Sequence, residues 1–113
     1  MWDECRGHSS KITVDCQTEL YKCGINGTKW NAYSVPVLSK IFTCPGFYEL
    51  EATGRARRGF YQDVLLLHEM SHAAFDINDH GYEWSGIKDL SAEKSIDNAD
   101  TYALFAQCSY YDC

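Results

Sequence analysis

The pattern of apolar and polar residues divides the chain into an N-terminal part that predicts strands and a C-terminal part that predicts helices. Residues 11–16, with the sequence Lys-Ile-Thr-Val-Asp-Cys, alternate polar and apolar side chains that favour strands, and residues 20–23 do so more briefly. A turn cluster at residues 24–27 precedes residues 30–43, whose apolar side chains surround Pro36. We therefore expect a short antiparallel sheet, with Pro36 at an edge or a bend.

Two helices are predicted in the second half of the chain. From Phe60 to Phe75 apolar residues recur at spacings of three and four without Gly or Pro, which is typical of a buried helix. A second helix is predicted from about Ser91 to Gln107, with Ser91 as its N-cap. Strands followed by two helices predict an α+β fold with the chemistry on the first long helix. The inner face of the second helix is predicted to contain Ile96, Ala99, Ala103 and Ala106.

The composition fits one small globular domain with an acidic surface. With 113 residues, 45% of them hydrophobic, the chain is long enough for one domain and too short for two, so we expect a single domain over residues 1–113. Ten Lys and Arg against sixteen Asp and Glu give a net charge of -6. This charge argues against a nucleic-acid partner, because the phosphate backbone of a nucleic acid attracts a basic surface. No stretch approaches the roughly 18 apolar residues of a membrane span. We expect a monomer with neither nucleic-acid nor membrane partners.

The cysteines indicate an oxidising compartment. None of them lies in a Cys-x-x-Cys pair, so we expect three disulfides, with six buried thiols as the alternative. Disulfides of this kind lead us to expect a secreted protein. Because the polar and acidic residues 1–5 do not resemble a signal peptide, we expect its mature form, with Met1 added for expression. The cysteines are Cys5, Cys16, Cys23, Cys44, Cys108 and Cys113.

The segment His68-Glu69-Met70-Ser71-His72 contains the groups that zinc-assisted hydrolysis requires. On a helix, His68 and His72 lie one turn apart on one face and can bind one cation together. Zinc lowers the pKa of a bound water towards about 7, the adjacent Glu69 can accept the proton, and the hydroxide attacks a peptide carbonyl. A structural pair of histidines is the alternative. Because leucines immediately precede His68, ionisable groups in this apolar helix would be costly without a partner, which favours a metal.

A catalytic zinc site holds three protein ligands, so a third should follow His72. Four residues are candidates: Asp76, Asp79, His80 and Glu93. Asp76 continues the same helix and would extend past the metal. His80 could serve, although the Gly common between the second and third ligands of three-histidine sites is missing. Glu93 suits an exposed first helical turn, and Asp79, inside the chain reversal, is favoured by geometry.

The residues that follow resemble a known family. Asp79-His80-Gly81-Tyr82 and, downstream, residues 97–106 (Asp-Asn-Ala-Asp-Thr-Tyr-Ala-Leu-Phe-Ala) resemble the deuterolysin family of fungal metalloproteases, the aspzincins. These proteins combine HExxH with an Asp three residues before a Tyr and with a downstream Asn-Ala-Asp helix. The resemblance covers nearly the whole chain, including the cysteine spacing.

The resemblance implies a role for each residue of the motif. It implies that His68, His72 and Asp79 bind one zinc ion and that Glu69 is the general base. Tyr82 matches the tyrosine that donates a hydrogen bond to the developing oxyanion, and a packed loop aromatic is the alternative.

Asp100 matches the Asp of the Asn-Ala-Asp segment, which in this family lies near the pocket for the residue after the cut. We therefore expect Asp100 to bind substrate, with helix capping or orientation of a ligand histidine as the alternative. The lysine-specific branch carries a second acid where this chain has Ala103, so strict lysine specificity is not expected.

The chain also departs from the family pattern. Residues 75–78 form a shorter connection to the metal Asp and lack a Gly-Thr pair, and only ten residues separate the first two cysteines. We therefore expect a shortened member that lacks much of the N-terminal helical region. The family order of cysteines implies the pairs Cys5–Cys16, Cys23–Cys44 and Cys108–Cys113.

Taken with the resemblance, these residues predict a secreted zinc endopeptidase that cleaves protein substrates, basic proteins among them. The expected fold is a small zincin-like α+β domain with a short antiparallel sheet, a helix that carries HExxH and a C-terminal helix, stapled by disulfides. The alternative is a non-catalytic secreted zinc-binding module, such as an effector or toxin on the same scaffold. A disulfide-rich binding domain without metal is a third hypothesis.

Overall fold

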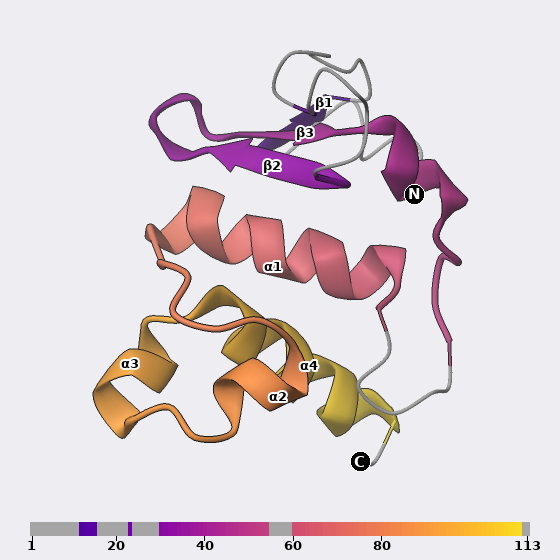
Figure 1. Ribbon diagram of the computed structural model, residues 1–113. Helices are drawn as coiled ribbons and strands as arrows, with labels where there is room; N and C mark the ends of the chain where they lie inside the picture. Colours follow the sequence, from indigo (N-terminus) through magenta and orange to yellow (C-terminus); the bar gives the residue numbers. More distant parts are fainter. Residues whose placement is uncertain (1–11, 16–22, 24–29, 55–59, 112–113) are drawn as a thin grey trace.

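The computed structural model describes residues 12–15, 23, 30–54 and 60–111. It has an α+β fold in which a small sheet, the long helix α1 and a group of shorter elements around α4 lie in successive layers (Figure 1). The strands are β1 (Thr13–Asp15), β2 (Ala32–Val35) and β3 (Lys40–Thr43). The helices are α1 (Gln62–Phe75), α2 (Glu83–Ile87), α3 (Ala92–Ile96) and α4 (Ala99–Tyr111), with 3₁₀ turns η2 (Pro36–Leu38) and η3 (Pro45–Glu49).

The sheet is mixed, with the strand order β1-β3-β2. β2 and β3 are antiparallel, with Ala32 opposite Thr43, as the short connection through η2 requires. β1 pairs with β3 in parallel, with Val14 opposite Ile41. The predicted antiparallel pairing therefore holds for β2 and β3. The direction of β1 differs because a long connection between paired strands permits a parallel arrangement.

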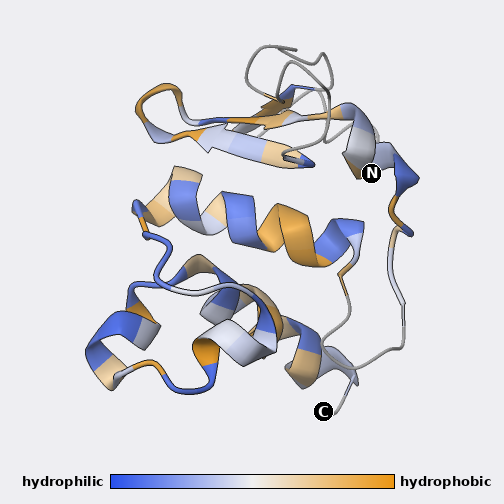
Figure 2. Cartoon of the chain, viewed as in Figure 1, coloured by the Kyte–Doolittle hydropathy of each residue, from blue (hydrophilic) through white to orange (hydrophobic). Residues whose placement is uncertain are grey.

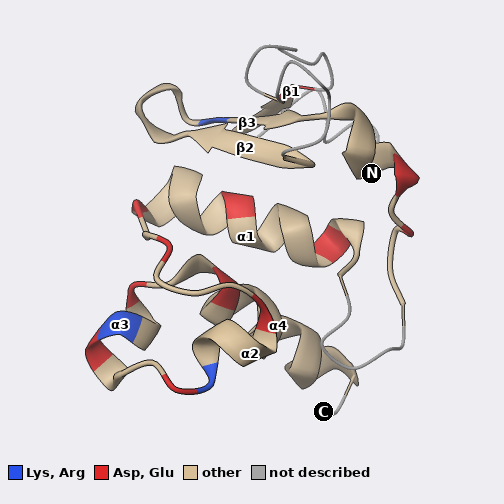
Figure 3. Cartoon of the chain, viewed as in Figure 1, with Lys and Arg blue, Asp and Glu red and all other residues tan. Residues whose placement is uncertain are grey.

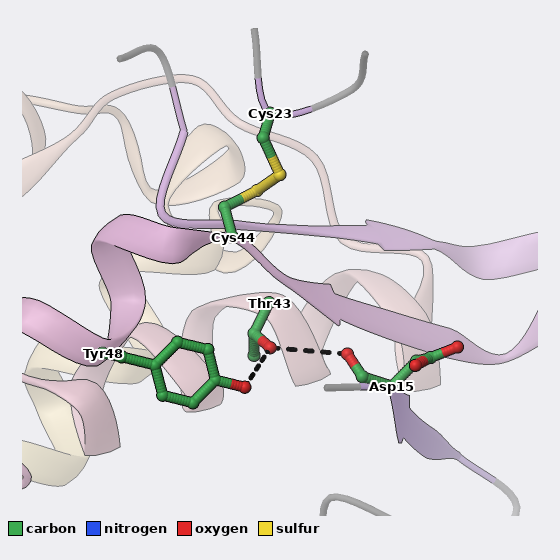
Figure 4. The surroundings of a disulfide bond; sticks show 5 residues. All are labelled: Asp15, Cys23, Thr43, Cys44 and Tyr48. Carbon is green, nitrogen blue, oxygen red and sulfur yellow. Dashed lines mark hydrogen bonds between the residues drawn. A yellow bond between two sulfur atoms is a disulfide. The ribbon is translucent and has the colours of Figure 1, made fainter. Parts of the chain in front are cut away.

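A disulfide joins Cys23 to Cys44 at the end of β3, which is one of the pairs that the family order implied (Figure 4). Beside it, the Thr43 hydroxyl donates to the Asp15 carbonyl at 3.4 Å and is hydrogen-bonded to the Tyr48 hydroxyl at 2.7 Å (Figure 4). These contacts join β1, β3 and η3 at one end of the sheet.

Some sequence predictions fall on residues that the structure does not describe. The strand expected at residues 20–23 lies largely outside the described residues. The remaining predicted disulfides, Cys5–Cys16 and Cys108–Cys113, also involve such residues, although Cys108 itself is disulfide-bonded.

Helix α1 lies between the sheet and α4, so it is covered on two sides (Figure 1). Leu65 packs with Ala32 and Phe47 on the sheet side, whereas Val64 packs with Ala103 on the α4 side. Burial of a Val or Leu side chain contributes about 1.5–3 kcal/mol. A helix between two layers has no single apolar stripe, and Figure 2 shows polar and apolar positions interspersed along α1. The polar groups of α1 are therefore buried with it.

The helix predicted from Ser91 to Gln107 is divided into α3 and α4. Ser91 caps α3 as predicted, since its hydroxyl accepts a hydrogen bond of 3.2 Å from the backbone N–H three residues on. The first residue of α4, Ala99, donates its N–H to the Asn78 carbonyl at 3.0 Å instead of continuing α3. Ile96 is 67% exposed at the end of α3, so its predicted place on the inner face is wrong.

The remaining helices are short. α2 spans five residues, too few for a periodic pattern to predict it. Across the described ranges, no helix combines the length and the apolar composition that crossing a bilayer requires.

Candidate metal centre

Helix α1 brings His68 and His72 together on the face directed towards the turn that follows it. Their Nε2 atoms lie 3.1 Å apart, because residues four apart on a helix are stacked one turn above the other. Both rings are largely shielded from solvent by the elements around α1.

The other ring nitrogens determine which tautomer each histidine adopts. Nδ1 of His72 lies 2.5 Å from the Ile77 carbonyl oxygen, which can only accept, so this nitrogen carries the proton. Nδ1 of His68 lies 2.5 Å from Oδ1 of Asp100, whose carboxylate likewise accepts. Both Nε2 lone pairs are therefore directed at one point. Two such lone pairs at 3.1 Å repel each other unless a cation or a proton lies between them.

Asp79 supplies a third group at that point. Its Oδ1 lies 3.4 Å from Nε2 of His68 and its Oδ2 lies 3.2 Å from Nε2 of His72. A tetrahedral zinc ion with ligand distances of about 2.0–2.1 Å would hold its donors roughly 3.3–3.4 Å apart. The three donor groups already have the spacing of a zinc site, and within the described part of the chain His68, His72 and Asp79 form a group that could hold a metal ion.

The end of α1 explains how Asp79 reaches back over the helix. Asp76 adopts a left-handed conformation, with φ of 55°, and its N–H donates to the His72 carbonyl at 3.0 Å. A left-handed residue at this position reverses the chain, and Asp tolerates the conformation better than most residues. The reversal turns the chain back along α1, so that a residue seven positions after His72 can lie beside it.

The other three candidate ligands lie elsewhere. Asp76 caps α1, and Nε2 of His80 is paired with Oδ2 of Asp97 at 2.9 Å. Glu93 is exposed in the first turn of α3. All four candidates belong to the described residues, and among them Asp79 alone joins the two histidines.

Glu69 follows His68 on α1 and faces a cleft of about 400 Å³ between α1, β2 and the turn after α1. Its side chain is buried and interacts with Ser34 of β2. Burial raises the pKa of Glu69 above the usual glutamate value, while the nearby His68 and His72 oppose the rise. A carboxylate with a raised pKa at a cleft is suited to accept and return a proton.

Tyr82 stands at the open side of the site. It is 61% exposed, and its ring lies 6.1 Å from the His68 ring at an interplanar angle of 24°. Partial burial, together with the nearby Asp79, raises the pKa of the Tyr82 phenol. The hydroxyl therefore stays protonated and can donate a hydrogen bond. Tyr82 also lines the same cleft as Glu69.

Asp100, at the start of α4, lies behind His68 and has both carboxylate oxygens engaged. Oδ1 contacts Nδ1 of His68 at 2.5 Å and Oδ2 accepts from the Glu83 backbone N–H at 2.6 Å. Burial alone would raise the pKa of Asp100, but these hydrogen bonds lower it below the usual range. The geometry fits orientation of a ligand histidine, and substrate binding by Asp100 stays a prediction.

His68 is surrounded by acidic groups. Burial alone would lower its pKa, but the hydrogen bond to Asp100 and the charges of Glu69 and Asp79 raise it. Acidic residues are spread over α1, the turn after it and the start of α4, whereas basic residues are sparse in the described part (Figure 3). The site therefore favours a bound cation.

The sequence did not single out the residues that hold the turn after α1. Asn98 is fully buried at the junction of α3 and α4, and its Oδ1 accepts hydrogen bonds from the backbone N–H groups of His80 and Gly81. Asp97 contacts Asn78 and His80. The Asn-Ala-Asp segment was a signal for this region, but it gave no indication that the Asn supports the turn.

A mixed sheet over a long helix that carries HExxH, with an aspartate folded back from the following turn, is a zincin-like α+β arrangement. The model of the aspzincin family, described as lysine-specific metallo-endopeptidase, matches residues 1–107. The chain belongs to this aspzincin family, and the resemblance predicted from the sequence is confirmed.

Individual relatives agree with this assignment. The chain is 37% identical over 86 residues to probable neutral protease 2 homolog A of Trichophyton rubrum, covering 73% of this chain and 24% of that protein. It is 32% identical over 103 residues to neutral protease 2 homolog MEP8 of Coccidioides posadasii, covering 88% and 28%. A neutral protease 2 homolog of Colletotrichum graminicola is 32% identical over 116 residues, covering 97% and 32%. The chain thus spans about a quarter to a third of the length of these relatives.

Proposed function

We propose that this chain forms a zinc-dependent endopeptidase domain that hydrolyses peptide bonds and holds one Zn²⁺ through His68, His72 and Asp79. The convergence of the two Nε2 atoms and the Asp79 carboxylate, at 3.1–3.4 Å from one another, carries the proposal. Two imidazoles and one carboxylate are a donor set that zinc accepts in catalytic sites, where a fourth position stays open.

The neighbouring side chains provide the rest of the chemistry. When bound, zinc acidifies water and polarises the carbonyl of the substrate. Glu69 accepts the proton of the attacking water on its carboxylate and delivers it to the leaving amine. Tyr82, exposed beside His68, donates a hydrogen bond to the developing oxyanion. Asp100 keeps the proton of His68 on Nδ1, so that Nε2 remains a donor of electrons to the metal.

We further propose that the substrates are proteins, basic ones among them, and that the protein is secreted and monomeric. The net charge of -6 supports attraction of cationic polypeptides. The Cys23–Cys44 disulfide supports an oxidising compartment. Strict lysine specificity is not expected, since Ala103 is fully buried against Val64 in the core and offers no acid to the cleft.

The experiment that tests the proposal replaces Glu69 by Gln. The Glu69→Gln variant should bind zinc at one ion per chain, because Glu69 is not a ligand, and should lose nearly all hydrolysis of casein or protamine. Glu93→Gln is the matched control, since Glu93 is exposed on α3 and does not line the cleft. Turnover by Glu69→Gln equal to that of the wild type would refute the proposed mechanism.

Zinc content separates this function from its alternatives. A wild-type protein that holds zinc near one ion per chain but cleaves neither substrate would support a non-catalytic zinc-binding module. A wild-type protein that holds no zinc at neutral pH would support a disulfide-rich binding domain without metal.

A further inference from the structure

Asn98 is a fully buried amide at the junction of α3 and α4, and both polar atoms of its side chain are hydrogen-bonded. Its Oδ1 accepts from the backbone N–H of His80 at 2.6 Å and from that of Gly81 at 2.9 Å. Its Nδ2 donates to Oγ1 of Thr101 at 3.1 Å. Asn98 therefore links the turn after α1 to the first turn of α4.

The backbone at Asn98 holds the other side of the same turn. Asn78 and Asn98 form a parallel β-bridge, and the Ala99 N–H donates to the Asn78 carbonyl at 3.0 Å. The residues on both sides of Asp79, Asn78 and His80, are thus hydrogen-bonded to the junction of α3 and α4. Asn98 lies 17 residues from Gly81 and 18 residues from His80 in sequence, so these contacts are tertiary.

The turn gains little support from regular structure of its own. Between the end of α1 and the start of α2 the described backbone has only this one isolated bridge. The carboxylate of Asp79 is 28% exposed and could otherwise leave the histidines for water. A ligand on an unsupported loop must be ordered when the metal binds, and that ordering weakens binding.

We propose that Asn98 is a positioning residue for the metal centre, which holds the turn 78–81 so that the Asp79 carboxylate faces His68 and His72 before zinc arrives. The inference rests on the proposed zinc site. Asn98 touches neither the ligand atoms nor the cleft and acts through the backbone on both sides of Asp79.

Asp97 makes a second set of contacts with the turn, but its side chain is more exposed to solvent than that of Asn98. Its carboxylate accepts from Nδ2 of Asn78 at 3.0 Å and pairs with His80 at 2.9 Å. The Asp97 side chain is 40% exposed, so water can replace these contacts when they are removed. Asn98 is fully buried and its partners have no such replacement, so Asn98 should matter more.

The test compares the zinc affinity of three variants, measured by competition with a chromophoric chelator. Asn98→Leu keeps the approximate volume but leaves two backbone N–H groups without an acceptor, and should weaken zinc binding by about 10–100-fold. Asn98→Asp keeps the acceptor oxygen and should lie closer to the wild type. Gln62→Leu is the matched control, because the buried Gln62 also bonds a backbone group, the Phe47 carbonyl at 2.9 Å, away from the turn.

Two further measurements separate positioning from general stability. The visible absorption of the Co²⁺-loaded protein reports the coordination geometry and should change in Asn98→Leu but not in Gln62→Leu. Thermal unfolding of the metal-free proteins should show similar losses for these two variants. If Asn98→Leu does not fold, Thr101→Val carries the test, because it removes the partner of Nδ2 and should weaken zinc binding in the same direction.

Zinc affinity in Asn98→Leu equal to that of the wild type, or lowered only as far as in Gln62→Leu, would overturn the inference and leave the zinc site standing. In the fallback case, wild-type affinity in Thr101→Val would do the same. A wild-type protein that binds no zinc would instead overturn the proposed function, and this inference with it.

Discussion

Replacement of Asp100 by Asn tests how Asp100 sets the tautomer of His68 at the proposed zinc site. The carboxylate accepts two hydrogen bonds, from Nδ1 of His68 at 2.5 Å and from the Glu83 N–H at 2.6 Å. An amide has one acceptor oxygen and one donor NH₂, so it can satisfy only one of these partners. If the oxygen stays with Glu83, the NH₂ faces His68 and favours the tautomer that carries its proton on Nε2. That nitrogen can then no longer bind a metal.

The size of the effect follows from these contacts. Loss of a partner that orients a ligand histidine lowers metal affinity by about 10–100-fold, or roughly 1.4–2.8 kcal/mol. A hydrogen bond to a charged group contributes about 1.5–3 kcal/mol to stability. Because the Asp100 side chain is only 15% exposed, we expect the metal-free Asp100→Asn variant to lose an amount in that range.

Zinc titration against a chelator and urea unfolding of the metal-free protein measure the two quantities. Asp89→Asn is the control, since Asp89 is exposed and pairs only with Lys88 on the surface among the described contacts. Wild-type zinc affinity in Asp100→Asn would refute the reasoning about the His68 tautomer. If KM for a peptide then rose while zinc affinity stayed constant, Asp100 would have the substrate-binding role that the family resemblance implied.

Two further predictions concern the cleft and the sheet. Tyr82→Phe keeps the ring beside His68 but removes the hydroxyl, which also bonds Asp79, so kcat for a peptide should fall by about 10²–10³-fold at saturating zinc. An unchanged kcat would make Tyr82 a packed loop aromatic. The double variant Cys23→Ser, Cys44→Ser opens a disulfide between residues 21 positions apart, so urea unfolding should show a loss of about 3 kcal/mol while zinc binding at α1 persists. Loss of zinc binding in the folded double variant would contradict the separation of these two regions.

Local patterns predicted the parts of the site that depend on one element alone. The apolar period from Phe60 to Phe75 predicted α1, whose bounds are Gln62–Phe75. The spacing of His68 and His72 places both rings on one helical face wherever the helix lies, because the period of an α-helix sets it. Ser91 as an N-cap is likewise a local property of its own turn.

Features that depend on distant partners were not predictable in the same way. The predicted long helix is divided into α3 and α4 where the Ala99 N–H pairs with the Asn78 carbonyl, and no helical period reports that competition. The direction of β1 depends on which edge of β3 it meets. The buried Asn98 and its hold on the turn became visible only when the two segments were side by side.

The sequence by itself therefore determined the helix that carries His68 and Glu69, the family of the chain and the four residues that could complete the centre. Only the tertiary structure selected Asp79 from those four and placed Asp100, 32 residues from His68 in sequence, behind its ring. The physical reason is that a helix is specified by hydrogen bonds between near neighbours, whereas a metal centre is assembled where separate elements pack.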